Sequence, residues 1–112
     1  MPKMQLSYEP LGKAPNLIFE GAMAGMQEAV SYFNQGLLPT VNNADTLKNL
    51  IDSGISVLCQ DNTELRKTIK VTAPKPHPTT PNRRFINLIW DNHERVVVLA
   101  QITCVTQEGG ES

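Results

Sequence analysis

Between residues 65 and 90 the chain carries six basic side chains and no acidic one. These residues, which we call the basic stripe, are Arg66, Lys67, Lys70, Lys75, Arg83 and Arg84. By contrast, residues 1–64 hold three basic residues against seven acidic ones, and residues 91–112 hold one against four. A stripe of positive charge can neutralise phosphate groups or meet an acidic protein surface. It can also mark a solvent-exposed edge strand, where lysine and arginine prevent pairing with other chains.

An acidic surface on another protein is the partner that the sequence favours, and nucleic acid is the alternative. The whole chain has a net charge of −1, and no aromatic residues alternate with the basic ones to stack on bases. The stripe also spans a proline-rich connector, residues 72–82, which holds four of the eight prolines. Residues 78–83 match the P-x-x-P-x-R pattern of peptides that bind aromatic grooves, but a stiff connector explains these prolines equally well.

Residue types that often carry catalysis or bind metals show no supporting pattern. Cys59 and Cys104 are far apart and belong to no CxxC pair. Each ends a predicted strand, which indicates buried and reduced cysteines, with a disulfide between them left open. His77 and His93 lie in polar segments, without a spacing that pairs them with cysteine or a carboxylate. The sequence therefore predicts a protein that is not an enzyme, with no metal site and no cofactor.

Two helices are predicted in the N-terminal half. Over residues 16–35, apolar residues recur every three or four positions, at Phe19, Met23, Met26, Val30 and Phe33. Gly36 follows, where a helix end favours a residue without a Cβ. The second helix covers residues 44–53 and is closed by Gly54. Its buried face is formed by Leu47, Leu50 and Ile51.

Gly21 and Gly25 are unusual inside the first helix, because each costs about 1 kcal/mol relative to alanine. Together with Ala22 and Ala24 they create a thin surface that another backbone can approach closely. The first interpretation is packing of this surface against the chain's own sheet. The second is a helix–helix contact between two copies of the chain.

The strongest strand signal lies in residues 85–105. Residues 85–90 and 96–105 are rich in β-branched and aromatic residues, and a polar turn, Asp91 to Glu94, joins them. Residues 55–59 and 65–73 are predicted to form a second hairpin, with a turn at 61–64. The alternative for 61–64 is a capping box that starts another helix at Leu65. A short strand is also expected at residues 4–8.

These elements predict an α+β fold, with two helices packed on one side of a four- to five-stranded, largely antiparallel sheet. Two C-terminal hairpins supply most of the strands. A single domain covers residues 1–106, and residues 107–112 form a disordered polar tail.

Self-association is predicted from the strand segment Val96 to Leu99, which is apolar on both faces. Two helices cover one face of the sheet, so the other needs a second subunit or a long loop. The expected dimer contacts are Gly21, Gly25, Val97 and Leu99.

The functional prediction is a non-catalytic protein-binding or adaptor module. It is expected to be homodimeric and cytoplasmic, and to act through a surface that includes the basic stripe and the proline-rich connector. Nucleic-acid binding by residues 66–84 is the alternative. No membrane association is expected, because the longest apolar runs fall well short of the ~20 residues that span a bilayer.

Overall fold

The computed structural model describes residues 3–107 of the 112-residue chain. In chain order the elements are β1 (Lys3–Pro10), α1 (Leu17–Asn34), α2 (Ala44–Cys59), α3 (Thr63–Thr68), β2 (Ile69–Val71), β3 (Lys75–Pro76), β4 (Arg83–Asp91) and β5 (Val96–Gln107). The predicted α+β class is confirmed.

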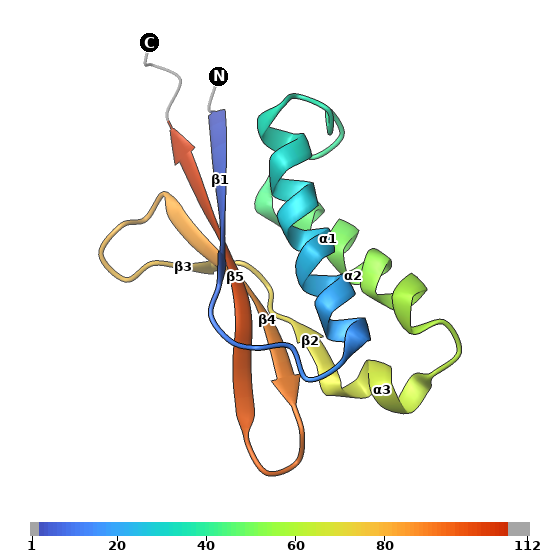
Figure 1. Ribbon diagram of the computed structural model, residues 1–112. Helices are drawn as coiled ribbons and strands as arrows, with labels where there is room; N and C mark the ends of the chain where they lie inside the picture. The colour runs from blue at the N-terminus through green and yellow to red at the C-terminus, as the bar shows by residue number, and fades with distance from the viewer. Residues whose placement is uncertain (1–2, 108–112) are drawn as a thin grey trace.

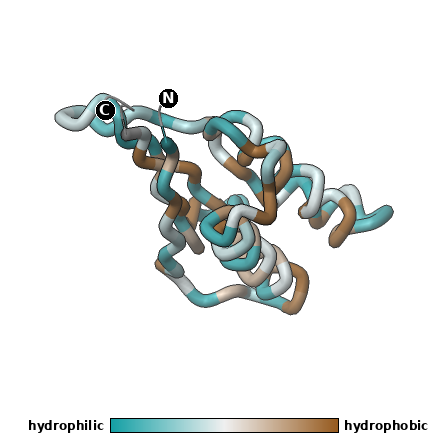
Figure 2. The backbone as a smooth tube through the Cα atoms, turned by 90° about the horizontal axis from the view of Figure 1, so that it is seen from above, coloured by the Kyte–Doolittle hydropathy of each residue, from teal (hydrophilic) through white to brown (hydrophobic). Residues whose placement is uncertain are grey.

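The strands form one antiparallel sheet in the order β1-β5-β4-β2, with β3 also paired to β4. Both long helices, α1 and α2, lie side by side on one face of this sheet and run in opposite directions (Figure 1). Among the described residues, no helix covers the opposite face. The view from above shows hydrophobic segments both in the strands and in the helices beside them (Figure 2). The molecule is therefore a layer of helices on a sheet with one open face.

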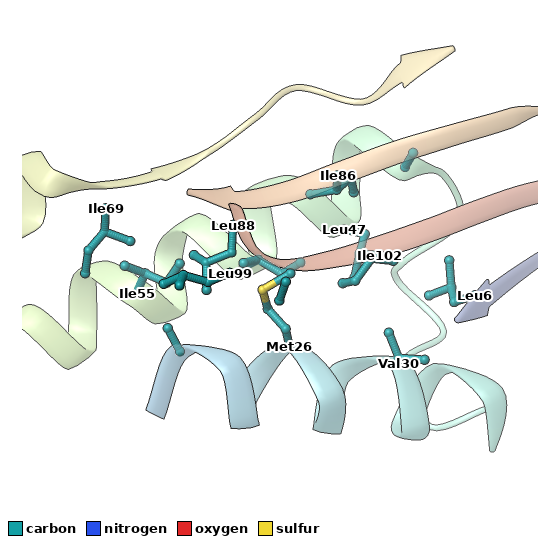
Figure 3. Packing of buried hydrophobic residues seen from close by; sticks show 14 of the residues in the cluster. Leu6, Met26, Val30, Leu47, Ile55, Ile69, Ile86, Leu88, Leu99 and Ile102 are labelled. Atoms are coloured by element: carbon teal, nitrogen blue, oxygen red, sulfur yellow. The ribbon is translucent and has the colours of Figure 1, made fainter. Parts of the chain in front are cut away.

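A single hydrophobic core fills the space between the two layers. Met26 projects from α1 toward Leu99 of β5, and Leu47 and Ile55 of α2 approach the strands from the other helix (Figure 3). Ile86, Leu88, Leu99 and Ile102 are fully excluded from solvent. Because side chains alternate across a strand, Asn87, between Ile86 and Leu88, faces away from the helices.

Local side-chain and backbone bonds set the limits of α1. Asn16 caps its start, where Oδ1 accepts hydrogen bonds from the backbone amides of Ile18 and Phe19 at 3.0 and 3.1 Å. Gly36 follows the end of the helix in the left-handed region, at φ 77°, and its amide donates to the carbonyl of Phe33. The predicted start and the predicted glycine stop are both confirmed.

The second helix is longer than predicted, and the predicted strand at residues 55–59 is wrong. Gly54 lies inside α2, which continues to Cys59. A strand would turn Ile55, Val57 and Cys59 to one side, whereas Ile55 and Cys59 are buried and Val57 is 73% exposed. Because every fourth residue from Leu47 to Cys59 is buried, the helix continues through Gly54. Leu50, predicted to be buried, is exposed instead.

The predicted hairpin at residues 55–73 does not form, because residues 63–68 are the short helix α3. The alternative interpretation of residues 61–64 is close to the observed structure. Oδ1 of Asn62 accepts a hydrogen bond from the amide of Leu65 at 3.0 Å and so caps the start of α3. Only the three residues of β2 remain of the predicted strand 65–73, and they pair with β4.

The predicted hairpin of residues 85–105 is confirmed as β4 and β5. In its turn, Oδ1 of Asn92 accepts hydrogen bonds from the amides of Glu94 and Arg95, and His93 takes the left-handed conformation. The register shifts at Leu99, because Leu88 pairs with Ala100 and Ile89 with Val98. This β-bulge lets two consecutive residues, Leu99 and Ala100, both be buried.

The remaining segments differ in part from their predictions. The proline-rich connector leads from β2 to β4 rather than between two hairpins, and its residues 75–76 form β3. Gln107, assigned to the tail, is the last residue of β5 and pairs with Lys3. The rest of the predicted tail, residues 108–112, lies outside the described residues. No helix in the described part of the chain is long and apolar enough to cross a membrane.

Candidate protein-binding groove

The basic stripe does not lie on one strand. Arg66 belongs to α3 and is held by three groups of the chain itself. Its guanidinium donates to the carbonyl of Ile69 at 2.7 Å, to the carboxylate of Asp52 at 3.0 Å and to the hydroxyl of Ser56 at 3.2 Å. Arg66 therefore links α3 and β2 to α2. The predicted strand at residues 65–73 is wrong at this position, and Arg66 has a structural role in the helix α3 instead.

Three other members of the stripe also lie beside carboxylates. The ion-pair distances are 3.7 Å for Lys67 and Glu64, 3.4 Å for Lys70 and Asp91, and 4.0 Å for Arg84 and Asp45. Within residues 3–107, Lys75 and Arg83 form no ion pair. The positive charge of the sequence is thus spread over α3, β2, β3 and β4, and much of it is neutralised locally.

The four predicted dimer contacts fall in two different places. Leu99 is fully buried in the core of its own chain, and Val97 packs against that core. The side chain of Leu99 is therefore not presented to another molecule, and that of Val97 is half-buried. Val96 and Val98 are exposed instead, on the face of the sheet away from the helices. Gly21 and Gly25 lie on the helical layer, far from this strand in the sequence, and both line a groove.

The groove lies between α1 and α2 and has a volume of about 420 Å³. Its lining is almost entirely apolar or small, and Glu28 is its one charged residue. Tyr32 of α1 is 45% exposed, and Leu50 and Leu58 of α2 are 43% and 38% exposed. An apolar depression edged by exposed large side chains is the usual form of a protein- or ligand-binding surface.

The glycines of the groove are not needed for packing within the chain. A Cβ atom added at Gly25 or at Gly54 would meet no atom within 4 Å. At Gly21 the nearest atoms would belong to the side chain of Leu58, at 3.5 Å, which is ordinary contact. Packing of Gly21 and Gly25 against the chain's own sheet is therefore wrong: Gly21 faces α2, and Gly25 faces open space.

Sequence reasoning missed the wall that α2 contributes to this groove. Leu50, Gly54 and Leu58 are four residues apart and lie on one side of a helix, but only if the helix continues through Gly54. The predicted helix ends before Gly54, so Leu58 is not assigned to that face. The signal that could have found the groove is this spacing beside the buried series Leu47, Ile51, Ile55 and Cys59.

Reactive and metal-binding groups do not gather elsewhere in the described part of the chain. Both cysteines are buried and unpaired. Burial raises the pKa of the Cys104 thiol to about 11, and the positive charge of Arg84 lowers it by less. A neutral thiol is a poor nucleophile, so Cys104 acts as a small apolar core residue. No three His, Cys, Asp or Glu side chains among residues 3–107 are grouped as metal ligands.

Comparisons of the chain with protein-family models, with curated proteins and with solved structures found no match.

Proposed function

We propose that this protein is a non-catalytic protein-binding or adaptor module that binds an α-helix of a partner protein in the groove between α1 and α2. The observation that carries this proposal is the groove itself, an apolar channel of about 420 Å³ between two helices that run side by side. Binding of an amphipathic helix in an apolar groove is a recurring mode of peptide recognition. The partner contributes the apolar face that the groove requires.

The shape of the groove suits a helix in particular. Gly21, Gly25 and Gly54 remove side chains from its walls, so the backbone of a third helix can approach α1 and α2 closely. Leu50, Leu58 and Tyr32 stand at its margins, where they can pack on the apolar side chains of that helix. Aromatic and large apolar side chains are also those that contribute most to binding at interfaces.

The test uses a fluorescent helical peptide with a leucine and alanine face and uncharged polar residues elsewhere. Binding to the full-length protein is measured by fluorescence anisotropy. A Cβ atom at Gly25 or Gly54 meets no atom within 4 Å, and Gly25→Leu and Gly54→Leu each add a large side chain to the groove lining. We expect each to weaken binding about tenfold or more, which is ~1.4 kcal/mol. Gln27→Leu is the matched control, because Gln27 is exposed on α1 outside the groove lining. Failure of the wild type to bind, or equal binding by all variants, would overturn the proposal.

Nucleic-acid binding is the second candidate, and one observation favours it. Lys75 is paired with Phe85 across β3 and β4, and the Phe85 ring lies 5.7 Å from the ring of His77. These residues and Arg83 belong to the helix-free face of the sheet. Basic residues beside aromatic rings on a sheet are the combination that binds single strands.

The nucleic-acid candidate is tested with a labelled single-stranded RNA. Binding is measured at two salt concentrations, and Lys75→Ala with Arg83→Ala is compared with Lys67→Ala, an exposed basic residue of α3. Loss of binding in the first variant alone, together with strong salt dependence, would support this function. Absence of binding at low salt would end it.

We also propose that the protein forms a homodimer through β5 in the cytoplasm. β1 pairs with β5 only from Ala100 onward, so Val96 to Val98 have a neighbouring strand on one side, β4. Such an apolar edge tends to pair with another strand, and a second copy supplies an identical one. The cytoplasmic location fits two cysteines that are unpaired, since reducing compartments keep thiols in this state.

A further inference from the structure

The charge along the groove comes from α1 and is negative. Glu28 lines the groove, whereas Glu20, exposed on the same helix eight residues earlier, is not part of the lining. Helix α1 contains no lysine or arginine. Neither glutamate takes part in an ion pair within residues 3–107. Glu28 is therefore the carboxylate that the groove offers to a partner.

The opposite wall of the groove, from α2, carries no charge. Its lining residues are Leu50, Ile51, Gly54, Ile55 and Leu58. The charged residues of α2 are already engaged with the chain itself: Lys48 with Asp52, Asp52 also with Arg66, and Asp45 with Arg84. The groove thus has one acidic wall and one neutral wall.

We propose that the partner helix has basic residues along the flank that faces α1 and uncharged residues along the flank that faces α2. This inference rests on the proposed function of the groove and specifies the chemistry of its partner. One lysine or arginine on the flank of the partner helix that faces α1 can lie opposite Glu28. Charge complementarity of this kind selects among helices whose apolar faces are alike.

A second copy of the chain is a poor occupant for the same reason. Its own α1 would bring two more glutamates to the groove and no basic residue. Its α2 would bring one lysine, Lys48, which is already paired with Asp52. The charges therefore favour a different protein in the groove.

The experiment compares three labelled helical peptides that have the same leucine and alanine face. One flank carries either two lysines, two glutamines or two glutamates at positions i and i+7. Since an exposed ion pair changes affinity by up to about fivefold, we expect the lysine peptide to bind the wild type about tenfold more tightly than the glutamate peptide. The glutamine peptide should lie between them, and the difference should shrink in about 0.5 M salt.

Charge reversal in the groove provides the variant. Glu28→Lys should reverse the order of the lysine and glutamate peptides, whereas Glu9→Lys makes the same charge change on exposed β1 and should leave the order intact. If all three peptides bind equally, or Glu28→Lys and Glu9→Lys behave alike, the charge inference is wrong and the proposed function stands. If no peptide binds, both fail. If Gly25→Leu turns a dimer into a monomer, a second copy occupies the groove and the inference is also wrong.

Discussion

Three glycines of the helical layer differ in what their backbone requires. Gly25 and Gly54 have open space where a Cβ would lie, and Gly36 has a φ of 77°. Alanine in a helix interior is favoured over glycine, so Gly25→Ala and Gly54→Ala should each raise the free energy of unfolding by about 0.5–1 kcal/mol. Gly36→Ala should lower it by about 1–2 kcal/mol, because L-residues are strained in the left-handed region.

Urea denaturation monitored by circular dichroism measures these three changes against the wild type. A loss of stability in Gly25→Ala would contradict the open space at this position. The result bears on the proposed function: if glycine at 25 and 54 makes the protein less stable, then the room that it leaves serves something other than the chain's own packing.

At the scale of elements, the course of residues 55–59 distinguishes a helix from a strand. In α2, Ile55 is buried and Val57 is exposed. We expect Val57→Lys to change the free energy of unfolding by no more than about 0.5 kcal/mol. Ile55→Ala should reduce it by about 2–5 kcal/mol, since it leaves a cavity in the core. Denaturant titration decides: comparable losses from both substitutions would indicate the strand that the sequence predicts.

The elements show where sequence reasoning succeeds. α1, β1 and the β4–β5 hairpin were predictable because periodicity and local stop signals agree: Asn16 and Gly36 bound α1, and Asn92 forms the hairpin turn. At residues 55–59 two signals conflict. Gly54 indicates a stop, while the spacing of Leu47, Ile51 and Ile55 indicates a continuing helix, and burial against the sheet decides in favour of the helix.

The groove and the partition of the basic stripe belong to a larger scale than any sequence window. The groove requires α1 and α2 side by side, so Gly21 and Leu58 meet although they are far apart in the chain. The contacts of Arg66 with Asp52 likewise depend on how α3 folds back on α2. The β-bulge at Leu99 shifts which valines face outward. Each of these depends on tertiary contacts that local residue preferences do not contain.

At the scale of the whole molecule, the proposed homodimer depends on the edge formed by Val96 to Val98. Val96 is 62% exposed, and β1 leaves this part of β5 unpaired on one side. Light scattering at micromolar concentration should give a mass near two chains of 12.4 kDa. The double substitution Val96→Lys and Val98→Lys should give a mass near one chain, because lysine on an edge strand opposes pairing.

Two controls place the dimer contact. Gln5→Lys adds a lysine to exposed β1, on the same open face of the sheet, and should leave the dimer intact. Gly25→Leu should also leave it intact, because the groove lies in the helical layer, on the other side of the sheet from the exposed side chains of Val96 and Val98. A wild-type mass near one chain that does not rise on concentration would exclude the dimer. If the dimer persists after the two valine substitutions, the dimer contact lies outside this part of β5.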